Sequence, residues 1–345
     1  MTEEFALSVK SLGTPYKLSR PVLEPTGKLG DFDSLMVDCP FVFFHDGRWW
    51  MTYVGFDGEG YRTGLAVSEN LIDFERRGMI LDWGKPREFD AHGAAGVWIL
   101  RKNDLFSLPK PRKWRGFYWM TYVGFGYKGY EAGPGAIGLA YSRDLIHWKR
   151  FNANPILKSD DGAYWESGGL YKSCLIQHRD EGETFYLFYN AKNKSYPWIE
   201  QTGFAISANL QKWRRYEGNP VVRVGSEGSW DCRFVSDPFI VLCKDAWVMF
   251  YYGFDGVHAQ DGIAFSKDLR NWHKWPGPVL NFGPPGSIDS QHAHKPCVIW
   301  RNGIFHHFYC AVRDKDGYRT ISVARSQPMI NDEPSQRLSR TWEQR

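Results

Sequence analysis

The chain has 345 residues, of which 43% are hydrophobic and 24% are charged, a balance typical of a folded globular protein. The formal net charge is only +4 with both signs spread along the chain, which argues against a nucleic-acid surface. The densest basic stretch, residues 109–115, carries two prolines and is interpreted as a solvated loop. No stretch approaches the roughly 18 apolar residues of a membrane helix, so we expect no membrane partner.

The N-terminal residues and the cysteines set expectations about the compartment. Residues 1–10 contain two glutamates and no apolar run, so we expect no signal peptide. None of the six cysteines belongs to a Cys-x-x-Cys pair, which argues against a zinc site. Reduced thiols in a cytoplasmic protein are the simplest expectation.

A three-part repeat runs along the chain. An aromatic strand is predicted at residues 49–53, 118–122, 185–189, 247–251 and 305–309. A second strand with small residues follows at residues 63–68, 137–142, 202–207, 261–266 and 320–326. The first four copies continue with a Ser-x-[Asp/Asn]-Leu-x-x-[Trp/Phe] turn, which begins Ser-Glu-Asn in the first copy, at residues 68–74, 142–148, 207–213 and 266–272.

Five copies spaced roughly 55–75 residues apart predict an all-β fold, a five-bladed β-propeller. We expect one catalytic domain over residues 1–345, with blades near 30–80, 85–155, 160–220, 228–278 and 286–326. The fifth copy stops after Ser326, so a strand near residues 16–23 is expected to close the ring. A two-sheet sandwich would explain the strands but not five copies of one unit.

Polar residues interrupt the segment before each aromatic strand, where the innermost strand of each blade is expected. The early acidic column holds Asp33, Asp90, Glu166, Asp231 and Asp289. The late column varies and holds Asp38, Ala95, Tyr171, Asp237 and His294. A position filled in every blade invites a structural role, whereas a variable position invites an individual one.

On this basis Asp38, Asp237 and His294 are candidate catalytic residues. Glu166 joins them because its longer side chain could reach the channel, and Asp90 because small residues beside it leave room for a ligand. The candidate substrate-binding residues are Asp33, His92, Trp165, Arg233, His292 and Lys295. Plainer roles remain open: the histidines could bond to loops, Trp165 could pack between blades, and Lys295 could pair with Asp237 or Asp289.

Carboxylates converging on a central channel suit cleavage of a glycosidic bond. One carboxylic acid protonates the leaving oxygen and a second carboxylate activates water or attacks the sugar. In inverting enzymes the two groups stand about 6.5–9.5 Å apart, a range that a propeller channel can supply.

The sequence resembles the five-bladed propeller glycosidases of glycoside hydrolase family 43 and its relatives in families 32, 117 and 130. Asp38-Cys39-Pro40, Asp237-Pro238 and the Ser-x-Asp-Leu-x-x-Trp turns carry the resemblance, which extends from Leu18 to Ser326. It implies an exo-acting, inverting glycoside hydrolase with an oligosaccharide substrate. By the family 43 pattern Asp38 would be the general base, Asp90 would tune a pKa and Glu166 would be the general acid.

The relatives imply alternatives. By the family 117 pattern Asp38, Asp237 and His294 would act together, with His294 as the acid. By the family 130 pattern Arg233, His294 and Lys295 would bind phosphate, and the enzyme would be a phosphorylase. A non-catalytic carbohydrate-binding propeller is a third hypothesis. No cofactor is required, and no catalytic metal is expected, although the resemblance leaves room for a structural calcium ion in the channel.

Overall fold

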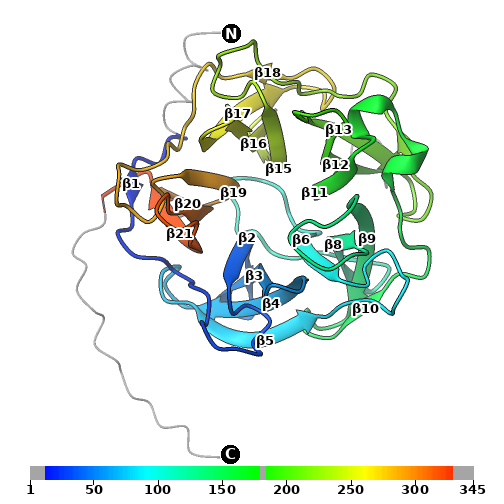
Figure 1. Ribbon diagram of the computed structural model, residues 1–345, viewed down its shortest axis with the longest axis horizontal. Helices are drawn as coiled ribbons and strands as arrows, with labels where there is room; N and C mark the ends of the chain where they lie inside the picture. Colours follow the sequence, from blue (N-terminus) through cyan, green and yellow to red (C-terminus); the bar gives the residue numbers. More distant parts are fainter. Residues whose placement is uncertain (1–11, 179–183, 329–345) are drawn as a thin grey trace, which may run out of the picture.

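The computed structural model describes residues 12–178 and 184–328, and its regular structure is almost entirely β (Figure 1). Two short 3-10 helices, η1 (Ser159–Asp161) and η2 (Tyr164–Glu166), are the helical elements of this part of the chain. Neither is long and apolar enough to cross a membrane. All six cysteines lie in the described part and none is in a disulfide.

The strands fall into five consecutive antiparallel groups. The first group is β2 (Met36–His45), β3 (Arg48–Phe56), β4 (Tyr61–Ser68) and β5 (Glu75–Leu81). The second is β6 (Gly93–Ile99), β8 (Phe117–Phe125), β9 (Ala136–Ser142) and β10 (Trp148–Arg150), with β7 (Lys113–Trp114) beside β8. The third is β11 (Gly169–His178), β12 (Thr184–Lys192), β13 (Glu200–Ser207) and β14 (Arg214–Arg215).

The fourth group is β15 (Phe234–Cys243), β16 (Ala246–Phe254), β17 (Ala259–Ser266) and β18 (His273–Lys274). The fifth is β19 (His292–Arg301), β20 (Ile304–Val312) and β21 (Arg319–Arg325), and β1 (Tyr16–Lys17) pairs antiparallel with β21. A further bridge joins Leu23 to Ile321. The segment expected near residues 16–23 therefore lies along the last strand of the fifth group.

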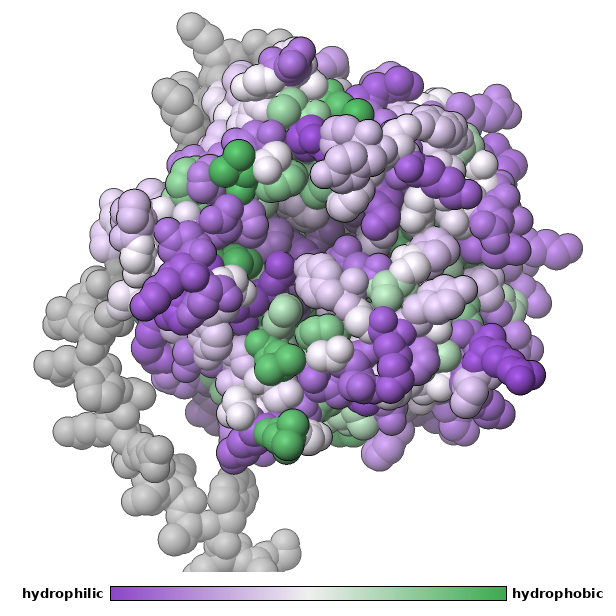
Figure 2. Space-filling model, in the orientation of Figure 1, coloured by the Kyte–Doolittle hydropathy of each residue, from purple (hydrophilic) through white to green (hydrophobic). Residues whose placement is uncertain are grey.

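The groups are arranged around a common centre, and the first strand of each group lies innermost (Figure 1). Short parallel pairs join the first group to the second, the third to the fourth and the fourth to the fifth, at Tyr61–Gly93, Glu200–Phe234 and Ala259–His292, so the strands form one sheet of nine and one of twelve. The second strands carry the aromatic repeat and pack the core between groups, with Tyr53 and Tyr122 fully buried. The face drawn in Figure 2 is largely hydrophilic and is hollowed near its centre.

The repeated turn has the same geometry in its four copies. In the second copy the Ser142 hydroxyl accepts the backbone N–H groups of Asp144 and Leu145, and Asp144 accepts those of the next two residues. Leu145 is buried at a left-handed φ of 68°, and the Trp148 indole donates to its carbonyl oxygen at 3.0 Å. The side-chain hydrogen bonds thus hold a strained turn that closes the outer edge of the sheet.

Each innermost strand contains a β-bulge, where one extra residue shifts the register. The shifts follow Asp38, Gly96, Leu170, Ser236 and His294. Three residues at the bulges have left-handed φ values, namely Cys39 at 48°, Asp237 at 56° and Lys295 at 66°. Bulges re-aim side chains next to functional sites, and here they turn neighbouring residues toward the centre.

Candidate functional site

The early acidic column forms five copies of one buried contact set, which we call the carboxylate triads. In each, the carboxylate accepts a hydrogen bond from a tyrosine of the second strand at 2.9–3.2 Å and pairs with a basic side chain of the outermost strand. The triads are Asp33–Tyr53–Arg76, Asp90–Tyr122–Arg150, Glu166–Tyr189–Arg215, Asp231–Tyr251–Lys274 and Asp289–Tyr309–Lys17. Burial, and then the adjacent carboxylate, raise the pKa of the tyrosines Tyr53 and Tyr122.

This arrangement places Asp90 and Glu166 away from the expected chemistry. Both carboxylates are fully buried, are bonded to tyrosine and arginine, and lie outside the lining of the central cavity. Their surroundings match those of Asp33, Asp231 and Asp289, so a longer glutamate side chain does not reach the channel. Asp90 lies in the turn before β6 and Glu166 in η2, so the structure places both away from the cavity, where the tuner and acid roles were expected.

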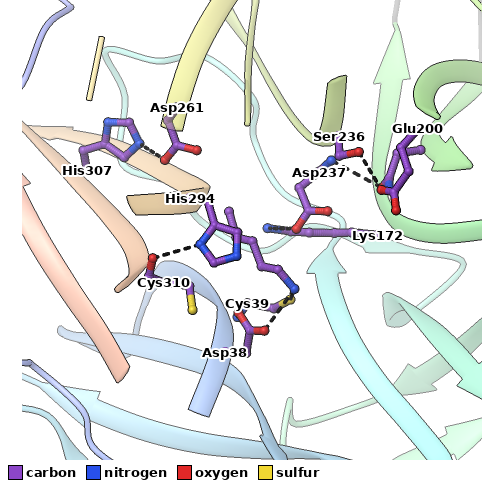
Figure 3. Close-up of polar contacts among 12 residues, drawn as sticks. Asp38, Cys39, Lys172, Glu200, Ser236, Asp237, Asp261, His294, His307 and Cys310 are labelled. Atoms are coloured by element: carbon purple, nitrogen blue, oxygen red, sulfur yellow. Dashed lines mark hydrogen bonds and ion pairs between the residues drawn. The ribbon is translucent and has the colours of Figure 1, made fainter. Parts of the chain in front are cut away.

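A cavity of about 240 Å³ lies where the five groups meet. Its charged lining residues come from four innermost strands and from loops and strand starts: Asp38, Glu131, Lys172, Glu200, Asp237, Lys295 and Arg319. Aromatic side chains complete the wall, among them Tyr61, Tyr130, Tyr171, Trp198 and Tyr252. Figure 3 shows the polar contacts that hold several of these residues.

Asp38 is the centre of an ion-pair cluster in the cavity. Its Oδ2 accepts hydrogen bonds from Lys295 Nζ at 2.9 Å and from an Arg319 guanidinium nitrogen at 2.8 Å. Burial alone would raise the pKa of this carboxyl, but the charges of Lys295 and Arg319 outweigh burial and hold it well below its usual range. Asp38 is therefore ionised near neutral pH. Lys295 pairs with Asp38 rather than with Asp237 or Asp289, because the bulge in β19 aims it across the cavity.

Asp237 faces Lys172 on the other side of the cavity, with 3.7 Å between Asp237 Oδ2 and Lys172 Nζ (Figure 3). Burial raises the Asp237 pKa, and the charges of Lys172 and Lys295 only partly offset it. The pairing of β15 with β16 shows that the sequence alignment of the late column was wrong by one residue in the fourth group. Asp237 occupies the bulge position held by Lys295 in the fifth group, and Ser236 takes the position expected for Asp237.

Glu200 begins β13 and is held by two hydrogen bonds. Its Oε2 accepts from Asn190 Nδ2 at 3.0 Å and from the Ser236 hydroxyl at 2.7 Å (Figure 3). Burial, and then the negative charge of Glu131, raise the pKa of Glu200 to about 7. Glu200 can therefore hold a proton near neutral pH and release it to a bound ligand.

The two histidines of β19 line the cavity as neutral side chains. His294 Nδ1 lies 3.1 Å from the carbonyl oxygen of Cys310, and burial followed by the charge of Arg319 lowers the His294 pKa well below its usual value. The same causes, in the same order, lower the pKa of His292 to about 4. A histidine that is unprotonated near neutral pH is a poor proton donor, so this environment disfavours His294 as the acid.

Of the other expected binding residues, Asp33, His92, Trp165 and Arg233 lie outside the cavity lining. His92 packs edge-on against Trp83 with 5.5 Å between ring centroids, and Trp165 stacks on Tyr189 at 5.7 Å. Arg233 donates to the carbonyl oxygen of Trp198 at 2.9 Å, which places it behind the wall rather than in it. Trp165 thus takes the packing role that was weighed against sugar stacking.

Four charged residues of the cavity were not found from the sequence, namely Glu131, Lys172, Glu200 and Arg319. Glu200 begins β13 and Arg319 begins β21, which are small-residue strands. The repeat pattern had started these strands two residues later, at Thr202, and one residue later, at Thr320. The sequence did contain a signal for these two residues, because the residue type at the start of the small-residue strand differs from copy to copy, as it does in the late column. Glu131 lies in the loop between β8 and β9, for which the repeat gives no register.

The cavity does not fit the calcium ion that the resemblance allowed. No group of three or more His, Cys, Asp or Glu side chains with metal-binding geometry occurs within residues 12–178 and 184–328. Around His294 the cations Lys295 and Arg319 accompany the single carboxylate of Asp38, and hard cations prefer clusters of oxygen ligands.

The sequence and fold match known carbohydrate-active proteins. A family model described as glycosyl hydrolases family 32 N-terminal domain matches residues 103–281. The solved structure of a BT0996 complex with RGII is 32% identical with a TM-score of 0.84, covering 95% of this protein and 96% of that one. Another solved structure, described as a glycoside hydrolase, is 31% identical with a TM-score of 0.82 over the same shares.

More distant relatives share the fold or part of the sequence. A thermostable family-43 glycoside hydrolase is 17% identical with a TM-score of 0.61, covering 86% of this protein and 92% of that one. The 1,2-beta-oligomannan phosphorylase of Thermoanaerobacter sp. (strain X514) is 29% identical over 139 residues, 38% of this protein and 45% of the phosphorylase. The match thus spans less than half the length of this curated relative. The fold is that of the propeller glycosidases, and the protein belongs to the glycosyl hydrolases family 32 N-terminal domain family.

Proposed function

We propose that the protein hydrolyses the terminal glycosidic bond of an oligosaccharide in the central cavity, with Glu200 as proton donor. The observation that carries this proposal is the buried Glu200 carboxyl at the cavity, whose pKa of about 7 keeps it protonated in mildly acidic solution and about half protonated at neutral pH. Glu200 gives its proton to the glycosidic oxygen as the bond between that oxygen and the anomeric carbon breaks. Raising the pKa of one carboxyl beside a second carboxylate is a recurrent way to obtain a general acid.

Glu131 is the proposed partner carboxylate. It lines the cavity, and its charge affects the Glu200 pKa more than any other charge does. Asp38, by contrast, already accepts hydrogen bonds from Lys295, Arg319 and a backbone N–H group. A carboxylate with a strongly lowered pKa is a weak base. In an inverting reaction Glu131 would take a proton from the water that attacks the anomeric carbon. Asp38 would instead hold Lys295 and Arg319 in position.

The rest of the cavity suits sugar hydroxyl groups. Among the described residues, Tyr171 Oη and Lys172 Nζ are buried without hydrogen-bond partners, and so is Asp237 Oδ2. Buried polar groups usually find a partner, so these three atoms are available to a polar ligand. A cavity of about 240 Å³ is small beside the roughly 300–1,000 Å³ pockets of drug-sized ligands, which favours a terminal sugar over the middle of an oligosaccharide.

The relatives support the choice of substrate class. The neighbour with 32% identity is in complex with RGII, and the family is that of glycosyl hydrolases. An oligosaccharide prepared from RGII, here called the RGII oligosaccharide, is therefore the first substrate to test, beside a panel of p-nitrophenyl monoglycosides.

The experiment compares the wild type with Glu200→Gln and Glu131→Gln on the first substrate that turns over. Glu200→Gln should lower kcat by about a thousandfold, within the range for a lost general acid. In wild type, kcat/KM should fall as pH rises through about 7, because Glu200 then loses its proton. Residual activity in Glu131→Gln should show this fall at lower pH. Full activity of Glu200→Gln would overturn the assignment.

A phosphorylase is the second candidate, because three cations line the cavity and the matched curated relative is a phosphorylase. The same assays with about 10 mM phosphate, above the usual range of KM values, would then release a sugar phosphate. Binding of the RGII oligosaccharide without turnover in either buffer would favour the third hypothesis, a carbohydrate-binding module.

We also infer that the five strand groups are the five blades of one propeller, with β1 completing the fifth blade. Lys17 of β1 supports this, because it supplies the cation of the fifth triad that Arg76, Arg150, Arg215 and Lys274 supply elsewhere. Lys17→Met should lower the stability about as much as Lys274→Met, as measured by chemical unfolding. No effect of Lys17→Met would count against closure by β1.

A further inference from the structure

Exposed aromatic side chains concentrate beside the cavity. Exposed large aromatic residues are uncommon on this protein, and five of the seven in the described ranges lie in three segments: the β8–β9 loop, η2 and the β12–β13 loop. These five are Tyr127, Tyr130, Tyr164, Tyr196 and Trp198, whereas Tyr16 and Phe106 lie elsewhere. Clustered exposed apolar side chains mark interaction sites more often than scattered ones do.

Three of these side chains lie on neighbouring residues of one rim of the cavity, and contacts link each of them to the β12–β13 loop. Trp198 lines the cavity wall and is 39% exposed. The Tyr196 ring lies next to it, with 6.0 Å between ring centroids, and is 88% exposed. The Tyr164 hydroxyl is hydrogen-bonded to Ser195, so the third ring is tied to the same loop.

The inner end of this surface is fixed in place. The Trp198 carbonyl oxygen accepts a hydrogen bond from Arg233 at 2.9 Å, and Lys192 Nζ lies 5.1 Å from the centre of the Trp198 ring. The segment that carries Trp198 is therefore bound to the β13–β15 side of the wall. The outer residues, Tyr196 and Tyr164, are largely exposed to solvent.

We propose that Trp198, Tyr196 and Tyr164, here called the aromatic platform, form a subsite that stacks on sugar rings beyond the bond that is cleaved. This proposal rests on the proposed function, because the platform would bind the part of the oligosaccharide that leaves when the glycosidic bond is cleaved. Sugar rings expose C–H faces and a rim of hydroxyl groups, and tyrosine and tryptophan present an apolar face with a polar edge. The occupant is the run of sugars that continues outward from the cavity, because Trp198 of the platform lines the cavity wall.

The test measures kcat/KM on two substrates of different length, the RGII oligosaccharide and the p-nitrophenyl monoglycoside that turns over best. Tyr196→Ala should lower kcat/KM for the oligosaccharide about tenfold more than for the monoglycoside, equivalent to about 1.4 kcal/mol of binding. Trp198→Ala should show the same preference with an additional loss on both substrates. Tyr16→Ala, an exposed tyrosine on β1, is the matched control and should change neither.

Equal loss on both substrates in Tyr196→Ala, or no loss on either, would overturn the platform. If no substrate turns over, the proposed function fails, and calorimetric binding of the RGII oligosaccharide still tests the platform: weaker binding to Tyr196→Ala than to Tyr16→Ala supports it, and equal or absent binding overturns it. A wild-type dimer that Tyr196→Ala dissociates in light scattering would assign the surface to a second copy of the protein and would also overturn the subsite.

Discussion

In the carboxylate triads and in the central cavity, the same kinds of side chain are used in opposite ways. Each triad repeats an acid, a tyrosine and a cation, so every buried charge has a local partner from its own neighbourhood. In the cavity, charged side chains from different strand groups meet, and some groups supply one charged residue whereas others supply two. Asp38 accepts two cations, while Glu200 accepts only neutral donors and faces another carboxylate.

The difference shows how a repeated fold acquires a single active centre. A triad pairs its carboxylate with a tyrosine and a cation and stabilises one sheet, outside the lining of the cavity. An incomplete set in the cavity leaves a raised pKa on Glu200. Within the described residues it also leaves a Tyr171 hydroxyl without a hydrogen-bond partner and a Lys172 ammonium held only by its 3.7 Å ion pair with Asp237, and a substrate can use these groups. The following predictions test this contrast, beginning with the largest expected effect.

Glu166→Ala should lower the free energy of unfolding by about 3 kcal/mol, the lower end of the cost of breaking a buried ion pair, because it leaves the partly buried Arg215 charge without its carboxylate and the buried Tyr189 hydroxyl without its acceptor. The kcat should stay near the wild-type value at a temperature where the variant is folded. Glu166→Gln keeps an acceptor oxygen and should recover part of the stability. A variant with unchanged stability and lost turnover would restore Glu166 as the acid.

Glu200→Gln should raise the free energy of unfolding at pH 9 by up to about 3 kcal/mol and leave it unchanged at pH 4. The pKa of Glu200 rises from an ordinary 4.5 to about 7 on folding, so its ionisation costs stability as pH rises through this range. The Gln side-chain oxygen can still accept from Asn190 and Ser236. Urea unfolding across this pH range measures the difference, with the exposed Glu227→Gln as control. A gain at acid pH would contradict this sign.

Asp38→Asn should lower kcat/KM by about a hundredfold, the cost of misplacing groups that contact the substrate. Its carboxylate holds Lys295 and Arg319, and the amide cannot hold both cations. The stability that Asp38 contributes is present above its ordinary pKa and is lost only as pH falls toward its lowered value. Turnover assays and acid unfolding check both parts, and full activity would remove Asp38 from the site.

Replacing each triad tyrosine with phenylalanine should cost about 1 kcal/mol of stability per site, the usual value of one hydrogen bond. The five variants are Tyr53→Phe, Tyr122→Phe, Tyr189→Phe, Tyr251→Phe and Tyr309→Phe. None should change KM, because no triad lines the cavity. A variant with altered KM would show that its triad communicates with the site.

The fold could be predicted largely from local pattern. The aromatic strands, the small-residue strands and the Ser-x-Asp-Leu turns each depend on residues close in sequence. The structure repeats the strands in five groups and the turn in four. The same pattern identified Asp38, Asp237, His292, His294 and Lys295, which all line the cavity. Variation within a repeat was the useful signal, because structural positions recur and cavity positions do not.

The choice among the acids could not be made from the sequence. Asp90 and Glu166 differ from Glu200 by what surrounds them after folding: a tyrosine and an arginine in the triads, and burial beside Glu131 at the cavity. A one-residue bulge also moved Asp237 out of the column assigned to it. The sequence by itself determined the repeat and the strands, whereas tertiary structure decided which charges meet, because pKa values depend on burial and on neighbours distant in the sequence.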